Sequence, residues 1–356
     1  GGTEKELATT KIEQAHMNWH NILLDLENMG TYDYPSLLFF DSEGKLVCHS
    51  GARTFNEIVD FLWENIGPAE YYETTDYSED GKVHILQKAT KGNGIDIIFM
   101  GDAFTDRLIA DKTYDAKMKE AAEYFFSEEP YTSFRDYFNV YYVTVISKNE
   151  EYEKETETAL GCWSFLGPHP QGNYRKCMEY AEKIPSIAEK MDDVVITTIL
   201  NNDPGCGVCS MSKPIHKGDH GGGLSIAYLS ASDSESLCRV ILHEAGGHGF
   251  AKLLDEYEIG SFPILDFVVE ENNAACRDYG WGKNVDYTSN PTKVRWSKFL
   301  TDPRYANEGL GVFEGAATYF KGAYRSTENS IMRYSRGGYN APSREAIYYR
   351  IHKLAF

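Results

Sequence analysis

Blocks of apolar residues recur along the chain at lengths that predict strands and helices. The run IDIIFMG at 95–101 is almost entirely apolar, which is typical of a strand buried on both faces of a sheet. Similar runs predict further strands at 139–147, 193–202 and Leu224–Ser230. Helical periodicity predicts helices between them, at 114–126, 174–191 and around 241–250. Strands that alternate with helices indicate an α/β fold on a mixed, twisted sheet.

The beginning of the chain has a smaller pattern of its own. Predicted strands at Leu37–Phe40 and Leu46–His49 enclose a Ser-Glu-Gly turn, and an amphipathic helix begins near Thr54. Residues 30–66 resemble the second half of a thioredoxin fold, in which the Tyr34–Pro35 bond would be cis. Because no CxxC motif stands upstream, we expect a structural module without redox chemistry. A generic hairpin followed by a helix is the alternative.

Three parts are therefore expected: a small α/β module at 1–68, a linker with one strand at 69–94, and a larger α/β domain at 95–356. The net charge of −19 argues against nucleic acid and against an anionic membrane surface as partners. No apolar run approaches the ~20 residues that a membrane span needs. The seven cysteines are too few for a disulfide scaffold.

The segment ILHEAGGHGF at 241–250 nearly matches the zinc-binding motif H-E-x-x-H, but its second histidine comes one residue late. In a regular α-helix, His243 and His248 would point about 140° apart and could not share an ion. A π-bulge absorbs one residue and returns both rings to one face. Gly246 and Gly247 stand where such a bulge is needed, although each weakens a helix by roughly 1 kcal/mol relative to alanine. We therefore expect a working histidine pair on a locally widened helix.

Three separated blocks resemble the IgA metallopeptidase family in the expected order. The central block, HEAGGHGFAKLLDEY, is similar to the family signature H-E-x-G-H-x-x-x-x-L-x-D-E-Y with one residue inserted. IIFMGDAFT and FFSEEPYTSFRDYFNVYYVTVIS precede it, and GLGVFEGAATYFKGAYRSTENSIMRY follows it. The resemblance covers about residues 90–350 and implies that the domain at 95–356 is a zinc metallopeptidase catalytic domain. The H-E-x-x-G-H spacing is also similar to the motif of the dipeptidyl peptidase III family.

The resemblance implies roles for the residues of the motif. His243 and His248 would bind a catalytic zinc, which takes three protein ligands and leaves one position for water. Zinc would lower the pKa of that water to around 7. Glu244 would act as general base, taking a proton from the water and passing it to the leaving amine.

The third zinc ligand is open to several interpretations. Metzincin peptidases place it six residues after the second histidine, where this chain has Leu254. Asp255, one residue further, is the expected ligand and requires a different chain path. Glu256 is the neighbouring alternative, and a distant carboxylate such as Glu314, or a histidine, is another.

The segment SIMRYS at 330–335 resembles the Met-turn of the metzincins, whose methionine packs beneath the zinc ligands. Met332 would take that place, and a plain core methionine is the alternative. In some metzincins a tyrosine two residues after the methionine leans toward the metal, and Tyr334 stands at the matching position. Tyr334 is therefore a candidate donor to the oxyanion of the reaction.

A second group of possible ligands lies at Cys206, Cys209, His216 and His220. A disulfide between the two cysteines, free thiols and a structural zinc site are the three interpretations. His220 could instead face the cleft, because it precedes the strand Leu224–Ser230. We expect that strand to pair with an extended peptide substrate.

Together these patterns predict an exported zinc metalloendopeptidase, secreted, periplasmic or on the cell surface, with its signal peptide removed. Its partner would be a protein or peptide substrate. A dipeptidyl exopeptidase and a binding protein on a retired peptidase scaffold are the alternatives. The presence of Glu244 argues against the latter, because a purely structural metal site needs no general base.

Overall fold

In the computed structural model the chain divides into two compact units, Gly1–Glu70 and Tyr71–Phe356. In the first unit, β1 (Leu37–Phe40) and β2 (Leu46–Ser50) pair antiparallel, as the predicted hairpin requires. The Tyr34–Pro35 bond lies outside the described residues. Apart from these two strands, the described residues are 71–153, 156–163, 170–187, 190–202, 207–214, 216–218, 220–231 and 234–356.

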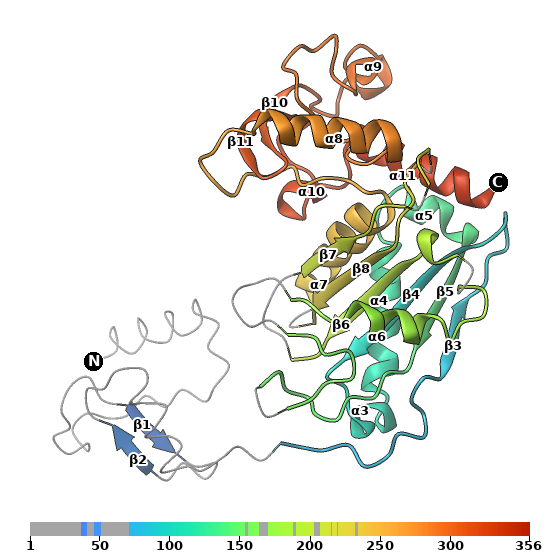
Figure 1. Ribbon diagram of the computed structural model, residues 1–356, viewed down its shortest axis with the longest axis vertical. Helices are drawn as coiled ribbons and strands as arrows, with labels where there is room; N and C mark the ends of the chain where they lie inside the picture. Colours follow the sequence, from blue (N-terminus) through green and yellow to red (C-terminus); the bar gives the residue numbers. More distant parts are fainter. Residues whose placement is uncertain are drawn as a thin grey trace. The chain divides into compact units, whose positions relative to one another are not determined.

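The second unit is built on a six-stranded sheet in the order β3-β5-β4-β6-β8-β7 (Figure 1). Its strands are β3 (Val83–Gln87), β4 (Ile95–Asp102), β5 (Phe138–Val143), β6 (Val195–Leu200), β7 (Gly207–Met211) and β8 (Ser225–Ser230). The four inner strands run parallel, whereas β3 and β7 run antiparallel to their neighbours. The predicted α/β fold with a mixed sheet is therefore confirmed.

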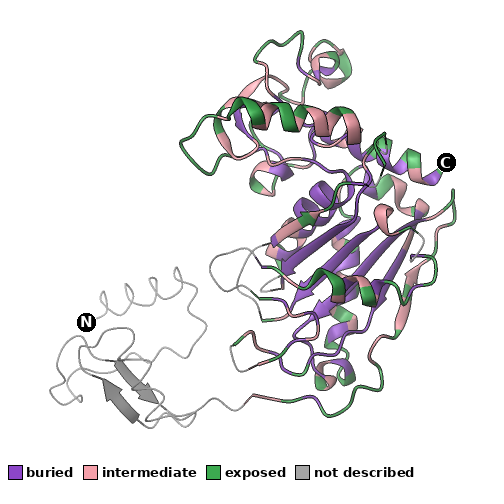
Figure 2. Ribbon diagram, in the orientation of Figure 1, coloured by how far each residue is buried: buried purple, intermediate pink, exposed green. Residues whose placement is uncertain are grey.

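Helices cover both faces of this sheet (Figure 1). Strand β4 is buried along its whole length, and its neighbouring residues Phe99 and Met100 enter two separate apolar cores (Figure 2). This follows from the alternation of side chains along a strand. The first core is covered by α4 (Thr113–Phe125), α7 (Ser234–Val240), η3 (Ile241–Phe250) and α11 (Ala341–Ala355). The second core is covered by α6 (Tyr174–Ala181).

Two details differ from the sequence prediction. The helix predicted at 174–191 is shorter in the structure, because α6 ends at Ala181. It begins as predicted, after Asn173, whose side chain caps the helix by accepting from two backbone N–H groups. Strand β7 was not predicted, and it pairs with the outer side of β8. The predicted strand Leu224–Ser230 is therefore internal, with β6 on one side and β7 on the other, and it cannot add a substrate strand.

The chain between η3 and α11 forms a smaller layer at one end of the sheet (Figure 1). Its three-stranded antiparallel sheet has the order β10-β11-β9. Its elements are α8 (Asp266–Tyr279), β9 (Val285–Asp286), α9 (Ser297–Leu300), β10 (Phe313–Ala316), β11 (Tyr319–Arg325) and α10 (Ile331–Tyr334). Short helices at α3 (Asp106–Ala110) and α5 (Tyr131–Phe134) complete the unit. Among the described helices, none has the length and apolar character to span a bilayer.

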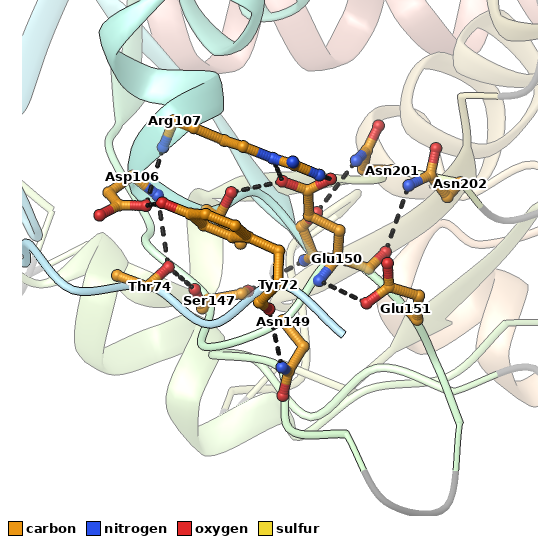
Figure 3. A network of polar contacts seen from close by, with 12 residues as sticks. Tyr72, Thr74, Asp106, Arg107, Ser147, Asn149, Glu150, Glu151, Asn201 and Asn202 are labelled. Atoms are coloured by element: carbon orange, nitrogen blue, oxygen red, sulfur yellow. Dashed lines mark hydrogen bonds and ion pairs between the residues drawn. The ribbon is translucent and has the colours of Figure 1, made fainter. Parts of the chain in front are cut away.

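A polar network at the carboxyl ends of the parallel strands ties the start of the second unit to the sheet (Figure 3). The buried carboxylate of Glu150 accepts two hydrogen bonds from Arg107, each of 2.6 Å. The guanidinium lies 4.4 Å from the centre of the Tyr72 ring, and the Tyr72 hydroxyl donates to Asp106 at 2.7 Å. Because these charged groups are paired with each other, we interpret the network as structural.

Candidate metal centre

The histidines of the motif lie on a π-helix. Directly after α7, the ten residues of η3 (Ile241–Phe250) have π-helical geometry, so the widening is longer than the single bulge that the sequence predicts. The wide turn brings His243 and His248 to one side of the helix, with ring centroids 4.9 Å apart. Both rings are buried. The extra residue in the motif therefore does not separate the histidines.

Asp255 meets both histidines through a single oxygen. Its Oδ1 lies 3.0 Å from Nε2 of His243 and 3.1 Å from Nε2 of His248. One ligand atom from each residue lies within 4.8 Å of the other two, and no other such group of three occurs among the described residues. The structure thus brings together the three residues that the sequence predicts as metal ligands.

The other ring nitrogens fix the orientation of the imidazoles. Nδ1 of His243 donates to the carbonyl of Ile331 at 2.8 Å, and Nδ1 of His248 donates to the carbonyl of Leu253 at 2.7 Å. A carbonyl can only accept, so each Nδ1 carries the hydrogen. With the hydrogen on Nδ1, Nε2 is the nitrogen of each neutral ring that can bind a cation, which is how backbone carbonyls orient histidine ligands in metal sites.

Distance and charge both fit a divalent metal. Tetrahedral coordination with bonds of about 2.1 Å puts ligand atoms about 3.4 Å apart, close to the two distances observed here. Burial lowers the pKa of His248, but the nearby Asp255 carboxylate outweighs it and raises this pKa to about 9. Burial raises the pKa of Asp255, yet the two imidazoles hold it well below its usual value. The group therefore attracts positive charge, and the donor set of two nitrogens and one oxygen suits zinc.

Glu244 lies beside this group. Its side chain is buried, and Oε1 lies 4.0 Å from Nε2 of His243. It packs against β7, because a Cβ at Gly207 would come within 2.9 Å of its Cγ. This glycine leaves room for the carboxylate between the helix and the edge strand.

Met332 lies beneath the π-helix. It is fully buried on the short helix α10, and its carbonyl accepts from the backbone N–H of Glu256 at 2.7 Å. If Gly247 carried a Cβ, that atom would lie 2.9 Å from Cε of Met332 and closer still to Sδ of Met332. Since neither Gly246 nor Gly247 has a positive φ, the space above Met332 explains the glycine at 247 better than backbone freedom does. The preceding residue, Ile331, holds the ring of His243.

Tyr334 stands at the exposed end of the same turn. Its side chain is 55% exposed, and the guanidinium of Arg333 lies 4.6 Å from its ring centre. Among the described contacts, none joins the Tyr334 hydroxyl to the three grouped residues. Its catalytic role therefore stays a prediction.

The alternative third ligands make hydrogen bonds elsewhere. The carboxylate of Glu256 is fully buried and accepts from the amides of Asn284 and Asn340 and from the hydroxyl of Ser330. Glu314 accepts from the backbone N–H of residue 322 and from the hydroxyl of residue 324. Both carboxylates lie outside the grouped atoms.

The cysteine–histidine segment gathers no second metal group among the described residues. Cys209 is a free thiol on β7, and Cys206 lies outside the described residues. His216 and His220 are exposed, and His220 lies against Gly280 rather than within the grouped ligands.

Three buried polar residues around the helix were missed from the sequence. Lys252 is 2% exposed and donates to the carbonyl of Gly249 at 2.6 Å and to the hydroxyl of Ser225, joining the end of η3 to β8. Burial lowers the pKa of Lys252 to about 7. The hydroxyl of Tyr131 donates to the carbonyl of residue 246 at 2.7 Å, and Tyr339 donates to that of residue 242. The only available signal was a lysine inside the apolar run GFAKLL.

The site has the residues typical of a metal-dependent hydrolase. They are a buried pair of histidines, an aspartate at hydrogen-bond distance from both, and a neighbouring glutamate. The sequence matches the IgA peptidase M64 family over residues 83–305, well over half of the chain, and the protein belongs to that family. It is thus a peptidase of the metallopeptidase type, which acts on proteins or peptides. No curated protein matches the chain. The family match begins after the first unit, whose thioredoxin resemblance stays a prediction.

Proposed function

We propose that the protein is a zinc-dependent endopeptidase in which His243, His248 and Asp255 bind the metal. The observation that carries the proposal is the convergence of two buried Nε2 atoms on one carboxylate oxygen, with both Nδ1 atoms held by backbone carbonyls. An aspartate ligand also offsets part of the charge of Zn²⁺. Two neutral imidazoles alone would not do so.

Within this proposal each residue has a defined task. Bound zinc supplies a Lewis acid that activates water and polarises the substrate carbonyl. Glu244 accepts a proton from water and delivers it to the leaving amine nitrogen, a role supported by its burial and its 4.0 Å distance from His243 Nε2. Met332 keeps the floor of the site apolar and supports the π-helix. Tyr334 donates to the developing oxyanion once substrate is bound, supported by its place on the turn that orients His243.

We propose that the substrate strand pairs with β7, and not with Leu224–Ser230 as expected from the sequence. In the described part of the chain, β7 is the last strand of the sheet, and it lies against both η3 and Glu244. An extended peptide on its outer edge would cross next to the general base, as in other cases of β-addition.

Hydrolysis by a Glu244→Gln variant tests the proposed mechanism. With zinc bound and the fold intact, we expect casein cleavage to fall by roughly 10²–10⁴-fold, the usual contribution of a general base. Glu153→Gln is the matched control, because it removes an exposed carboxylate of the same size. Wild-type-like turnover in zinc-loaded Glu244→Gln would contradict the role of Glu244, and a zinc-loaded parent that cleaves nothing would favour a binding protein.

Endopeptidase action has its own test. A peptide with a blocked N-terminus should be cleaved as readily as the unblocked peptide. Loss of cleavage on blocking would support the dipeptidyl exopeptidase instead.

A further inference from the structure

The loop between Asp255 and α8, together with the first turn of α8, exposes large apolar side chains. Ile259 is 71% exposed, Phe262 76%, Leu265 55% and Phe267 63%, within nine residues of sequence. Figure 2 shows this stretch as a largely exposed loop leading into α8. Single exposed apolar residues are common on protein surfaces, but a cluster of this density marks an interaction site.

Backbone hydrogen bonds connect this loop to the metal centre. The carbonyl of Asp255 accepts from the N–H of Ala317 at 2.8 Å, and the N–H of Ile264 donates to the carbonyl of Lys321 at 3.0 Å. The loop therefore runs beside the chain from 317 to 321, in which 317 and 318 form a turn and the residues from 319 belong to β11. Phe320, 42% exposed, lies on this neighbouring strand. The apolar residues thus lie on the segment that continues directly from the proposed metal ligand, with the nearest, Ile259, four residues after Asp255.

The inner end of the loop touches the site itself. The Tyr257 ring stacks on His243, with centroids 6.2 Å apart and planes 24° apart. Glu258 accepts from Arg333, at 3.3 Å, and so joins the loop to the turn that carries Tyr334. The inner end of the loop therefore contacts both the metal centre and the turn that carries Tyr334.

We propose that Ile259, Phe262, Leu265, Phe267 and Phe320 form an exosite, called here the apolar exosite, for a bulky apolar segment of an unfolded polypeptide substrate. This inference rests on the proposed function, because the occupant is the chain being cleaved. Its place on the segment that follows Asp255 favours the chain being cleaved over a separate partner as the occupant. Of the carboxylates on this segment, Glu258 and Glu271 are paired with Arg333 and Lys213, whereas none of the described ion pairs includes Asp266 or Glu270. Together with the net charge of −19, they disfavour an anionic membrane and favour basic residues beside the apolar segment.

The test uses unfolded lysozyme, reduced and capped with iodoacetamide, as a basic and apolar substrate. Phe262→Ser should raise the KM for this substrate roughly tenfold, the effect of losing one buried aromatic contact. The kcat/KM for a four-residue fluorogenic peptide, which lacks a bulky apolar segment, should stay unchanged. Ile85→Ser is the matched control, because Ile85 is also a large apolar residue, is 57% exposed, and lies on β3, the edge of the six-stranded sheet opposite to β7.

A binding measurement separates failure of the exosite from failure of the proposed function. Fluorescence anisotropy of labelled unfolded lysozyme on zinc-loaded Glu244→Gln should give a Kd that Phe262→Ser also raises roughly tenfold. If the parent cleaves nothing while this Kd changes as expected, the peptidase proposal fails and the exosite stands. Equal KM and Kd in the Phe262→Ser and Ile85→Ser proteins would overturn the exosite. Two other outcomes would also overturn the exosite. One is parent binding to neutral phosphatidylcholine vesicles that Phe262→Ser abolishes and Ile85→Ser does not, and the other is self-association with the same pattern.

Discussion

A substitution at Gly247 tests whether the π-helix rests on Met332. An alanine in a helix interior is ordinarily about 1 kcal/mol more favourable than glycine. Here the added Cβ would lie 2.9 Å from Met332 Cε and closer still to Sδ, against normal separations of about 3.5–4.0 Å. Met332 is fully buried, so its side chain has little free space into which it can move away from the added Cβ.

The expected cost follows from these two opposing terms. Overpacking a buried site costs about 1–3 kcal/mol, which exceeds or offsets the gain in helix propensity. The two terms leave a net loss of up to about 2 kcal/mol in the free energy of unfolding of Gly247→Ala. Zinc affinity should fall as well, because the displaced turn contains the Ile331 carbonyl that orients His243.

Urea unfolding and competitive zinc titration of four proteins measure both effects: parent, Gly247→Ala, Met332→Ala, and the double variant. Met332→Ala alone should cost about 2–5 kcal/mol through the cavity it leaves. In the double variant the new Cβ enters that cavity, so the two costs should be less than additive by about 1 kcal/mol or more. A Gly247→Ala protein with parental stability and zinc affinity would refute the packing explanation of this glycine.

Two further predictions concern residues around the centre. Tyr334→Phe should lower kcat with little change in KM if its hydroxyl serves the transition state, and steady-state kinetics with unchanged kcat would exclude that role. The second prediction is that Lys252→Met changes how the free energy of unfolding depends on pH. Because burial lowers the folded-state pKa of Lys252 to about 7 while an unfolded lysine titrates near 10.4, the unfolded chain binds more protons between these values. The parent should therefore gain stability as pH rises from about 7 to about 10, and Lys252→Met should lack this gain. Parallel profiles of unfolding free energy against pH would contradict the lowered pKa.

The grouping of His243, His248 and Asp255 could be predicted because these residues lie close together in sequence. His243 and His248 share one helix, and Asp255 follows within seven residues, so few chain paths separate them. The choice between Asp255 and Glu256 could not be made locally. In the structure it depends on Asn284 and Asn340, which bind the carboxylate of Glu256 from distant parts of the chain.

The α/β fold was predictable from its buried strands, whereas the sheet edge was not. Strand β4 is apolar at nearly every position, but β7 has the sequence GVCSM, with few residues typical of strands. Its pairing with β8 is a tertiary contact that leaves no local periodicity. For the same reason the hydroxyl contacts of Tyr131 and Tyr339 with η3 gave no signal in the sequence.

The zinc stoichiometry of an Asp255→Ala variant is the sharpest test of the proposal that His243, His248 and Asp255 bind one zinc. Parent and variant would be loaded with zinc, freed of excess metal by gel filtration, and measured by mass spectrometry of the metal, with Asp266→Ala as the surface control. We expect one zinc per chain in the parent and in Asp266→Ala, and far less than one in Asp255→Ala, because the remaining histidines lose their anionic partner. Full zinc content in Asp255→Ala would contradict the proposed ligand set.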